Sequence, residues 1–281
     1  MRIRIAHETI YRYEKPAKSV IQTLRLAPRS HDGQHVIRWR INVDQDVRLS
    51  EIEDAFGNIG HVFSAAGQIE SMCVSVEGEV EMQDHAGVLR GTIERFPVAL
   101  YLRETPLSQA DDALCRFARE AAAGSSGALA ICHALNEAIH ATLAFDADPQ
   151  TVASSNAATA LAAKRGVAQD LAHIFIACAR SLAIPARYVS GLVYLPEAET
   201  SGNAAHAWAE AYVEGLGWVG FDPAYEVCPT DHHVRVAMGL DYLGAAPVRG
   251  ARYGGEGESF DVRISLSERL AQRQAQRQAQ N

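Results

Sequence analysis

The sequence feature that most constrains the fold is a change in hydrophobic period. Residues 167–182 carry apolar side chains at three- and four-residue steps, which is the spacing of one buried helix face. The residues on this face are Val167, Leu171, Ile174, Phe175, Cys178 and Leu182. Gly166 precedes the segment and Pro185 follows it, so a helix is expected between them. Segments on both sides alternate with the period of two that is typical of strands, which predicts an α+β protein built around a central helix.

The predicted helix places Ala168 in its first turn. Unpaired backbone N–H groups and the positive end of the helix dipole lie at this position. A cysteine placed there would have a lowered thiol pKa and would serve as a nucleophile. The sequence has alanine instead, so Ala168 offers a methyl group where chemistry would need a thiol.

Two strands joined by a turn follow the helix. Residues 205–213 alternate small apolar residues with polar or aromatic ones, residues 214–217 are typical of a turn, and residues 218–223 predict a second strand. In an antiparallel hairpin the start of one strand lies beside the end of the other, so His206 and Asp222 are expected to be neighbours. The sequence leaves the register open. The two side chains share a face only if the numbers of facing residues add to an even total.

These segments resemble the bacterial transglutaminase-like family, candidate cysteine peptidases of the wider papain-like group. The matching motifs of the core are Gly166-Val167-Ala168-Gln169-Asp170, Ile184-Pro185-Ala186-Arg187-Tyr188-Val189-Ser190-Gly191, His206-Ala207-Trp208 and Gly217-Trp218-Val219-Gly220-Phe221-Asp222-Pro223. Motifs outside the core also match, namely Tyr11-Arg12-Tyr13, Asp54-Ala55-Phe56-Gly57-Asn58, Gly239-Leu240-Asp241-Tyr242 and Pro247-Val248-Arg249-Gly250. The resemblance covers nearly the whole chain. It implies an N-terminal antiparallel β domain followed by a transglutaminase-like core, with a central helix packed on an antiparallel sheet.

The resemblance also implies a Cys–His–Asp triad. His206 and Asp222 match two of its members, and Ala168 stands where the family has its nucleophilic cysteine. A thiolate at that position would attack an amide carbonyl of a peptide or protein substrate, while Asp222 orients the imidazole of His206. Backbone N–H groups at the helix start and Gln169 would hold the oxyanion, and Trp208 is expected at the substrate. Water would complete hydrolysis, or an amine would complete transamidation.

Alanine cannot begin this reaction, and loss of the nucleophile in a comparable triad costs roughly six orders of magnitude in turnover. Cys178 lies ~15 Å along the helix on its buried face and cannot substitute, and Cys228 has no helix terminus to activate it. Two explanations of Ala168 stay open. One is an engineered replacement in an active enzyme, which the retained His206 and Asp222 favour. The other is a natural pseudoenzyme that binds peptides or proteins. A purely structural protein is a third, weaker reading.

The chain is expected to divide into three parts. Residues 1–100 alternate like antiparallel strands with one solvated face and predict an N-terminal β-rich domain. Residues 101–266 are assigned to the transglutaminase-like core. Residues 267–281 are rich in Gln, Ala and Arg and predict a frayed or disordered polar tail.

Composition limits the partners. The formal net charge is −8 and the calculated pI is about 5.8, which argues against nucleic acid as a main partner. No apolar run approaches the ~18 residues of a membrane span, and the first residues lack the apolar segment of a signal peptide. Five cysteines without metal-ligand spacing predict reduced thiols and a cytoplasmic protein. We expect no metal and no cofactor, and the oligomeric state is left open.

Two further groups of polar residues receive structural interpretations. Asp170 and His173 lie three apart on the predicted helix, a spacing at which they could pair locally, and we interpret both as structural. His232 and His233 follow an aspartate in a polar segment, and we predict a surface position for both.

Overall fold

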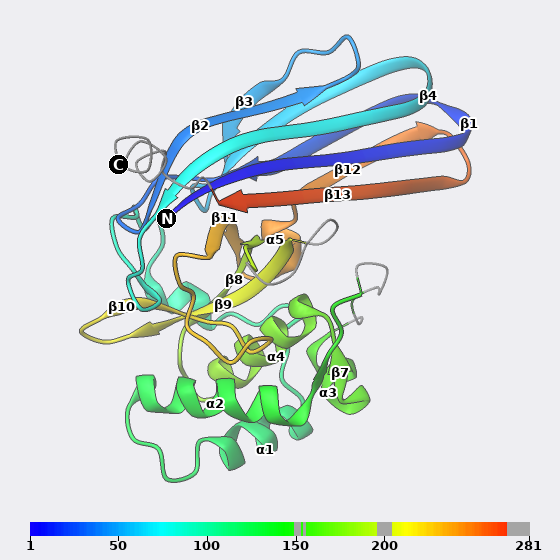
Figure 1. The fold of residues 1–281 in the computed structure, drawn as a ribbon. Coiled ribbons are helices and arrows are strands. Elements are labelled where there is room, and N and C mark those ends of the chain that lie inside the picture. The colour runs from blue at the N-terminus through cyan, green and yellow to red at the C-terminus, as the bar shows by residue number, and fades with distance from the viewer. Residues whose placement is uncertain (149–152, 154–155, 196–203, 269–281) are drawn as a thin grey trace, which may run out of the picture.

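A computed structural model gives the fold of the chain (Figure 1) and describes residues 1–148, 153, 156–195 and 204–268. Two antiparallel sheets follow one another, and the larger helices gather on the side of the second sheet that faces away from the first. This architecture confirms the predicted α+β class. The predicted tail begins at the last residues of a strand, and its remainder, residues 269–281, lies outside the described residues.

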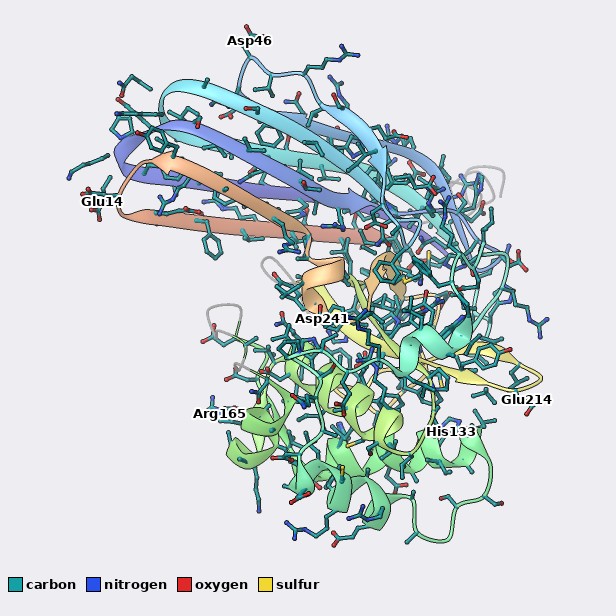
Figure 2. The ribbon with its side chains drawn as sticks, turned by 180° about the vertical axis from the view of Figure 1, so that it is seen from behind. Glu14, Asp46, His133, Arg165, Glu214 and Asp241 are labelled. Carbon is teal, nitrogen blue, oxygen red and sulfur yellow. The ribbon has the colours of Figure 1, made fainter. Side chains whose placement is uncertain are left out.

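The first sheet is built on two very long strands. It contains β1 (Arg2–Ala27), β2 (Gln34–Val43), β3 (Ser50–Glu53), β4 (Ile59–Met82), β12 (Val248–Gly254) and β13 (Glu258–Glu268). β1 pairs with β4 along one edge and with β12 and β13 along the other. The long strands curve back at the end of the sheet remote from the helices, where Glu14 and Asp46 are labelled in Figure 2. The curved sheet encloses its own apolar cluster, which includes Leu24, Phe63 and Met72.

Three strands join a different sheet from the one that the predicted domain boundaries imply. β12 and β13 belong to the first sheet, although the sequence analysis placed everything up to residue 266 in the core. Conversely, β5 (Val88–Leu89) pairs with the second sheet, although it lies within residues 1–100. Alternation identifies a strand but does not say which sheet edge it will join, because that choice depends on distant partners.

The second sheet carries the predicted hairpin. Its order is β11-β8-β9-β10-β5, with β8 (Ala186–Val193), β9 (Ala205–Val213), β10 (Gly217–Phe221) and β11 (His233–Gly239). The helices are η1 (Val98–Leu102), α1 (Asp112–Ala121), α2 (Ala128–Thr142), α3 (Ala157–Ala163), α4 (Ala168–Ser181) and α5 (Tyr242–Ala245). A short parallel pair, β6 (Ala144–Phe145) and β7 (Arg165–Gly166), precedes α4. No helix among the described residues is long and apolar enough to cross a membrane.

Helix α4 is the predicted central helix. It packs against β8 and β9, and α1, α2 and α3 surround it, so nearly all of its residues are buried. Its start depends on Gly166, because a Cβ at that position would lie 2.6 Å from the Cβ of Asp170. The Asp170 carboxylate accepts a hydrogen bond from the Val167 N–H at 3.1 Å, which satisfies one of the free donors at the helix start.

Asp170 and His173 on α4 contact different parts of the chain. Asp170 caps the helix start, as described above. His173 accepts a hydrogen bond from the Tyr242 N–H at 3.1 Å and stacks on Tyr188 with ring centroids 5.0 Å apart. Burial lowers the pKa of His173 to about 4, so this imidazole is neutral near pH 7. Both residues therefore have structural roles, as the sequence analysis concluded.

The two sheets are joined by apolar packing and by buried side-chain amides, among them that of Asn58. Ile3, Ile5, Ile264 and Leu266 of the first sheet cluster with Leu192, Ala204 and Val234 of the second part. Asn58 donates to the Met238 carbonyl at 2.7 Å and accepts from the Met238 N–H at 2.8 Å. Asp241, labelled in Figure 2, is buried where the two parts meet. These contacts hold the first sheet against the edge of the core.

Candidate active site

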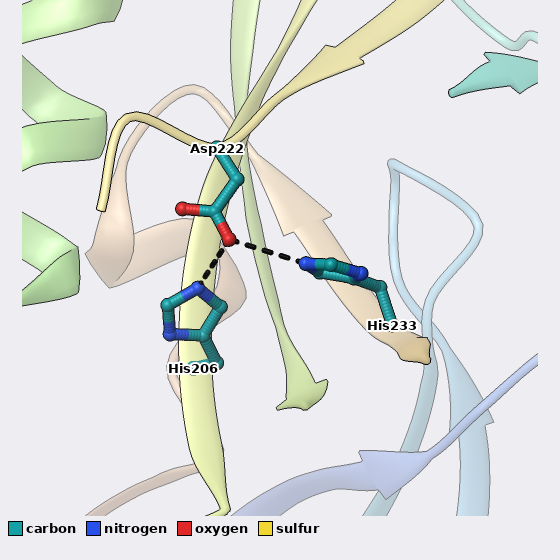
Figure 3. A group of neighbouring side chains, drawn as sticks. All are labelled: His206, Asp222 and His233. Atoms are coloured by element: carbon teal, nitrogen blue, oxygen red, sulfur yellow. Dashed lines mark hydrogen bonds and ion pairs between the residues drawn. The ribbon is translucent and has the colours of Figure 1, made fainter. Parts of the chain in front are cut away.

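The register of the hairpin places His206 and Asp222 on one face of the sheet. Phe221 lies opposite Ala209 and Trp218 opposite Tyr212, so the numbers of facing residues add to an even total. The Nε2 atom of His206 lies 2.6 Å from Oδ2 of Asp222 (Figure 3). Both residues are buried, with exposed fractions of 7% and 0%. The structure thus brings together the two residues that the sequence indicated as neighbours.

Asp222 is held by three hydrogen bonds. Its Oδ2 atom also lies 3.2 Å from Nε2 of His233, and its Oδ1 atom accepts from the Ala224 N–H at 3.0 Å. Burial by itself raises the pKa of Asp222, but the charge and hydrogen bonds of His206 and His233 outweigh it and hold that pKa well below its usual range. The carboxylate is therefore ionised and fixed in orientation.

His233 is the residue of this group that sequence reasoning missed. We predicted a surface position, but the side chain is buried and points at Asp222 (Figure 3), and only its neighbour His232 is partly exposed. The Thr230 N–H donates to Nδ1 of His233 at 3.1 Å. Because Nδ1 accepts this bond in the neutral ring, Nε2 carries the proton and donates it to Asp222. Both His233 and Val234 at the start of β11 are buried, so alternation along this strand does not distinguish an inward-facing histidine from an exposed one.

The same three residues have the composition of a metal site. Ligand atoms of His206, Asp222 and His233 lie within 4.8 Å of one another, and two imidazoles with a carboxylate suit zinc. A metal-bound histidine donates the N–H of its other ring nitrogen to an acceptor. In His233 the other nitrogen faces a donor, the Thr230 N–H. With His206 and Asp222 in direct contact at 2.6 Å, the geometry is that of a hydrogen-bonded group.

Ala168 and His206 line one cavity. Ala168 is the first residue of α4 and is 9% exposed, and the cavity of about 400 Å³ is bordered by Ala168, Gln169, His206 and Tyr225 among others. The ring of Tyr225 lies 5.1 Å from that of His206, and the ring of Phe145 lies 6.4 Å away on the segment that pairs with the residues before α4. No described residue forms a hydrogen bond with Nδ1 of His206.

Trp208, which the sequence predicted at the substrate, packs beside the two histidines of the site. It lines a separate, smaller cavity of about 60 Å³ with Glu210 and His233, and it is absent from the lining of the large cavity. Its ring packs 6.4 Å from His206 and 5.5 Å from His233. Because side chains alternate along β9, Trp208 lies on the same face of the sheet as His206, two residues further along the strand. It packs against both histidines and does not line the cavity that contains Ala168.

The thiols of the chain lie away from this site. Cys178 is fully buried within α4, and burial raises its pKa strongly. Burial also raises the pKa of Cys228, which is half-buried and follows the hairpin. Neither cysteine lines the cavity that contains Ala168. Within the described part of the chain, the site has a histidine and an aspartate in contact and no thiol beside them.

A buried ion network, also not foreseen from the sequence, lies behind the site. Glu210 on β9 accepts hydrogen bonds from Arg187 at 2.6 Å and from Arg235 at 2.7 Å. Arg187 also binds Glu94, and its guanidinium lies 3.8 Å from the ring centroid of Trp218. Burial raises the pKa of Glu210, but the two arginines outweigh it and lower that pKa to about 2. The network ties β8, β9 and β11 together beside the histidines.

Comparisons with known proteins find relatives in sequence and a solved structure of the same fold. A relative from Mycobacterium leprae, an uncharacterized protein, is 29% identical over 286 residues, which cover 96% of this chain and 99% of that protein. A protein-glutamine gamma-glutamyltransferase of Pseudomonas aeruginosa is 34% identical over 101 residues, 31% of this chain and 14% of that protein. The crystal structure of a candidate cysteine protease from Cytophaga hutchinsonii superposes with a TM-score of 0.76 at 20% identity, over 95% of this chain and 90% of that one. That similarity shows a shared fold.

Two family models account for most of the chain. Residues 3–81 match the bacterial transglutaminase-like N-terminal region, and residues 116–223 match the transglutaminase-like superfamily. The first match lies in the curved sheet, and the second runs from α1 to the end of the hairpin that carries His206 and Asp222. The chain therefore belongs to the bacterial transglutaminase-like family.

Proposed function

We propose that this site is that of a transglutaminase-like cysteine peptidase or amidase which lacks its nucleophile, so that the chain binds peptide or glutaminyl amide substrates without turning them over. One observation carries the proposal. The His206–Asp222 pair is assembled at 2.6 Å on the same cavity as the first residue of a buried helix. That position is where a thiol would be activated, and it holds Ala168.

The proposed chemistry with a cysteine at position 168 uses the two nitrogens of His206 for different tasks. Nε2 is engaged by Asp222, which leaves Nδ1 to take the proton of the thiol. The thiolate attacks the amide carbonyl, and the imidazolium then protonates the departing amine, so that a thioester remains. Backbone N–H groups at the start of α4 stabilise the oxyanion. Water or an amine releases the acyl group and restores the thiol.

The acyl group proposed as substrate is that of glutamine or of a peptide. The name of the Pseudomonas aeruginosa relative, protein-glutamine gamma-glutamyltransferase, supports a glutaminyl amide, and the matched stretch is 101 residues long. The protein from Cytophaga hutchinsonii that shares the fold is named as a cysteine protease, which supports a peptide bond. Both reactions pass through the same thioester, so the His206–Asp222 pair serves either one.

The form with Ala168 supports a second proposal, a pseudoenzyme that acts as a peptide- or protein-binding module. The cavity of about 400 Å³ persists beside the intact His206–Asp222 pair, so the chain keeps room for a ligand without the means to cleave it. An engineered replacement and a natural loss of the cysteine leave the same geometry. The codon for residue 168 in the native gene distinguishes the two origins.

The test is the substitution Ala168→Cys, assayed for ammonia release from an N-blocked glutaminyl-glycine peptide and for cleavage of a casein digest. We expect turnover in A168C and none in the Ala168 form. The control is the double variant A168C/H206A, which keeps the thiol and loses the base. Equal activity of A168C and A168C/H206A, or none in either, would contradict the enzyme proposal and leave the binding module.

A further inference from the structure

The face of the first sheet that packs on the core extends beyond it. In the pairing of β1 with β13, Leu266 lies opposite Ile5, Ile264 opposite His7 and Val262 opposite Thr9. Because facing residues share a side of the sheet, this face carries the alternate residues Ile5, Phe260, Val262, Ile264 and Leu266. At one end of the face, Ile264 and Leu266 pack against Leu192 and Val234 of the second sheet.

At its other end the same face is open and lies over the cavity of His206. The exposed fraction rises along β13 from 3% at Ile264 to 38% at Val262 and 67% at Phe260. Ile5, Phe260, Val262 and Ile264 line the cavity that also contains Ala168 and His206. We call these four residues the apolar wall. An exposed aromatic and an exposed β-branched residue side by side are costly in water unless they bind something apolar.

Most of the charged groups that line the cavity have partners of their own. Arg25 is ion-paired with Asp54 at 2.9 Å, and Asp146 with Arg165 at 2.6 Å. His7 contacts the hydroxyl of Thr9 at 2.9 Å, and burial lowers its pKa to about 4, so it is neutral near pH 7. The lining also includes Asp148, a second carboxylate on the side of Asp146. This distribution disfavours an acidic ligand, because the arginine of the described lining, Arg25, already shares its charge with Asp54, although its Nη1 atom has no hydrogen-bond partner among the described residues.

We propose that the apolar wall binds an apolar side chain of the substrate peptide, next to the residue whose amide lies at His206. The first sheet then sets substrate specificity. It selects peptides in which a large aliphatic or aromatic residue stands next to the glutamine over peptides in which an acidic residue stands there. This inference rests on the proposed function, because it takes the occupant of the cavity to be a peptide. The continuity of the wall with the site of His206 supports that occupant.

Binding is measured by isothermal titration calorimetry on the full chain with Ala168, which cannot consume the ligand. The probes are acetylated, amidated pentapeptides with glutamine at the centre and either leucine or glutamate beside it, once on its N-terminal side and once on its C-terminal side. Burial of one leucine side chain predicts about tenfold tighter binding of the leucine peptide in one of the two placements. Equal affinities in both placements would overturn the proposal.

The variant Phe260→Ser locates the preference, with Tyr253→Ser as its matched control. Tyr253 is 68% exposed, close to the 67% of Phe260, but it lies on β12 and does not line the cavity. We expect F260S to abolish the leucine preference and Y253S to retain it. A change of oligomeric state in F260S by light scattering, with peptide affinities unchanged, would identify the wall as an interface between copies and overturn the proposal.

The two proposals fail in different ways. A leucine preference that depends on Phe260, together with an inactive A168C variant, would leave the wall as a peptide site and remove the enzymatic reading. An active A168C variant with no preference between the probes would support the enzymatic function and remove the apolar wall as a peptide site.

Discussion

The backbone N–H of Thr230 donates to Nδ1 of His233 at 3.1 Å, while Nε2 of the same ring lies 3.2 Å from Asp222. With Nδ1 occupied as an acceptor, His233 presents a proton on Nε2 to the carboxylate that also holds His206. Asp222 thus receives two imidazole donors on one oxygen atom. The aspartate is positioned from both sides, and His206 is oriented through it.

His233→Ala should weaken the pair without removing either of its members. In an A168C background we expect the thiol to alkylate about tenfold more slowly at mildly acidic pH, because Asp222 loses one hydrogen bond between a donor and a charged acceptor. His233→Gln can return an N–H near the position of Nε2 and should restore most of the rate. Alkylation rates measured from pH 5 to 9 test this. Equal pH profiles for H233A and H233Q would show that His233 only fills space.

The thiol introduced by Ala168→Cys should be more reactive than an ordinary one. The start of α4 and the imidazole of His206 together should depress its pKa below the ~8.5 of free cysteine. Iodoacetamide at mildly acidic pH should therefore modify this position rapidly and Cys178 slowly, because Cys178 is fully buried. Peptide mapping by mass spectrometry measures both rates in one sample.

His206→Ala in the same A168C background is the control for that prediction. It keeps the helix terminus and removes the imidazole, so most of the rate advantage should disappear. A thiol that alkylates no faster than a free cysteine at the same pH would show that the site has lost more than its nucleophile.

The central helix could be predicted because each of its determinants is local. Gly166, the apolar period and Pro185 all lie within twenty residues, and the structure gives a helix over Ala168–Ser181. The sequence could indicate that His206 and Asp222 lie on neighbouring strands, but it could not predict their contact. That contact requires the register of the β9–β10 hairpin, which depends on the turn. That turn places Gly217 opposite Val213, and the resulting even total brings the two side chains to one face.

The rest of the site could not be predicted, because its determinants are distant in sequence. His233 reaches Asp222 across a loop of ten residues, and nothing in the intervening sequence indicates that the loop folds back. β13 reaches His206 only because it pairs with β1 at the other end of the chain. Such contacts follow from the choice of sheet edge, and alternation does not encode that choice.

Gly166→Ala should destabilise the start of α4. The added Cβ would lie 2.6 Å from the Cβ of Asp170, closer than side-chain carbons approach, so the helix start or Asp170 must move. Overpacking of this kind costs about 1–3 kcal/mol. Urea unfolding of G166A against the parent chain measures the loss. A free energy of unfolding equal to that of the parent would show that the first turn accepts a side chain, which contradicts the need for glycine beside Ala168.

Glu210 should make the fold sensitive to acid. Its pKa is about 2 in the folded chain against an ordinary value of 4.5, because Arg187 and Arg235 stabilise the carboxylate more than burial destabilises it. A lowered folded-state pKa contributes stability above pH 4.5, and the contribution is lost as the pH falls from 4.5 towards 2. Glu210→Gln should therefore cost about 3–5 kcal/mol near neutral pH, since it leaves two guanidinium groups without their shared carboxylate.

Denaturant unfolding of E210Q between pH 7 and pH 3 measures both parts of this prediction. The variant should be less stable than the parent at pH 7, and the gap should narrow as the pH falls, because the parent loses the contribution that the variant never had. Glu214→Gln, on the exposed turn of the same hairpin, is the matched control and should change the free energy of unfolding little. A constant gap between E210Q and the parent over the whole pH range would show that the charge of Glu210 does not contribute, and that the network acts through its hydrogen bonds alone.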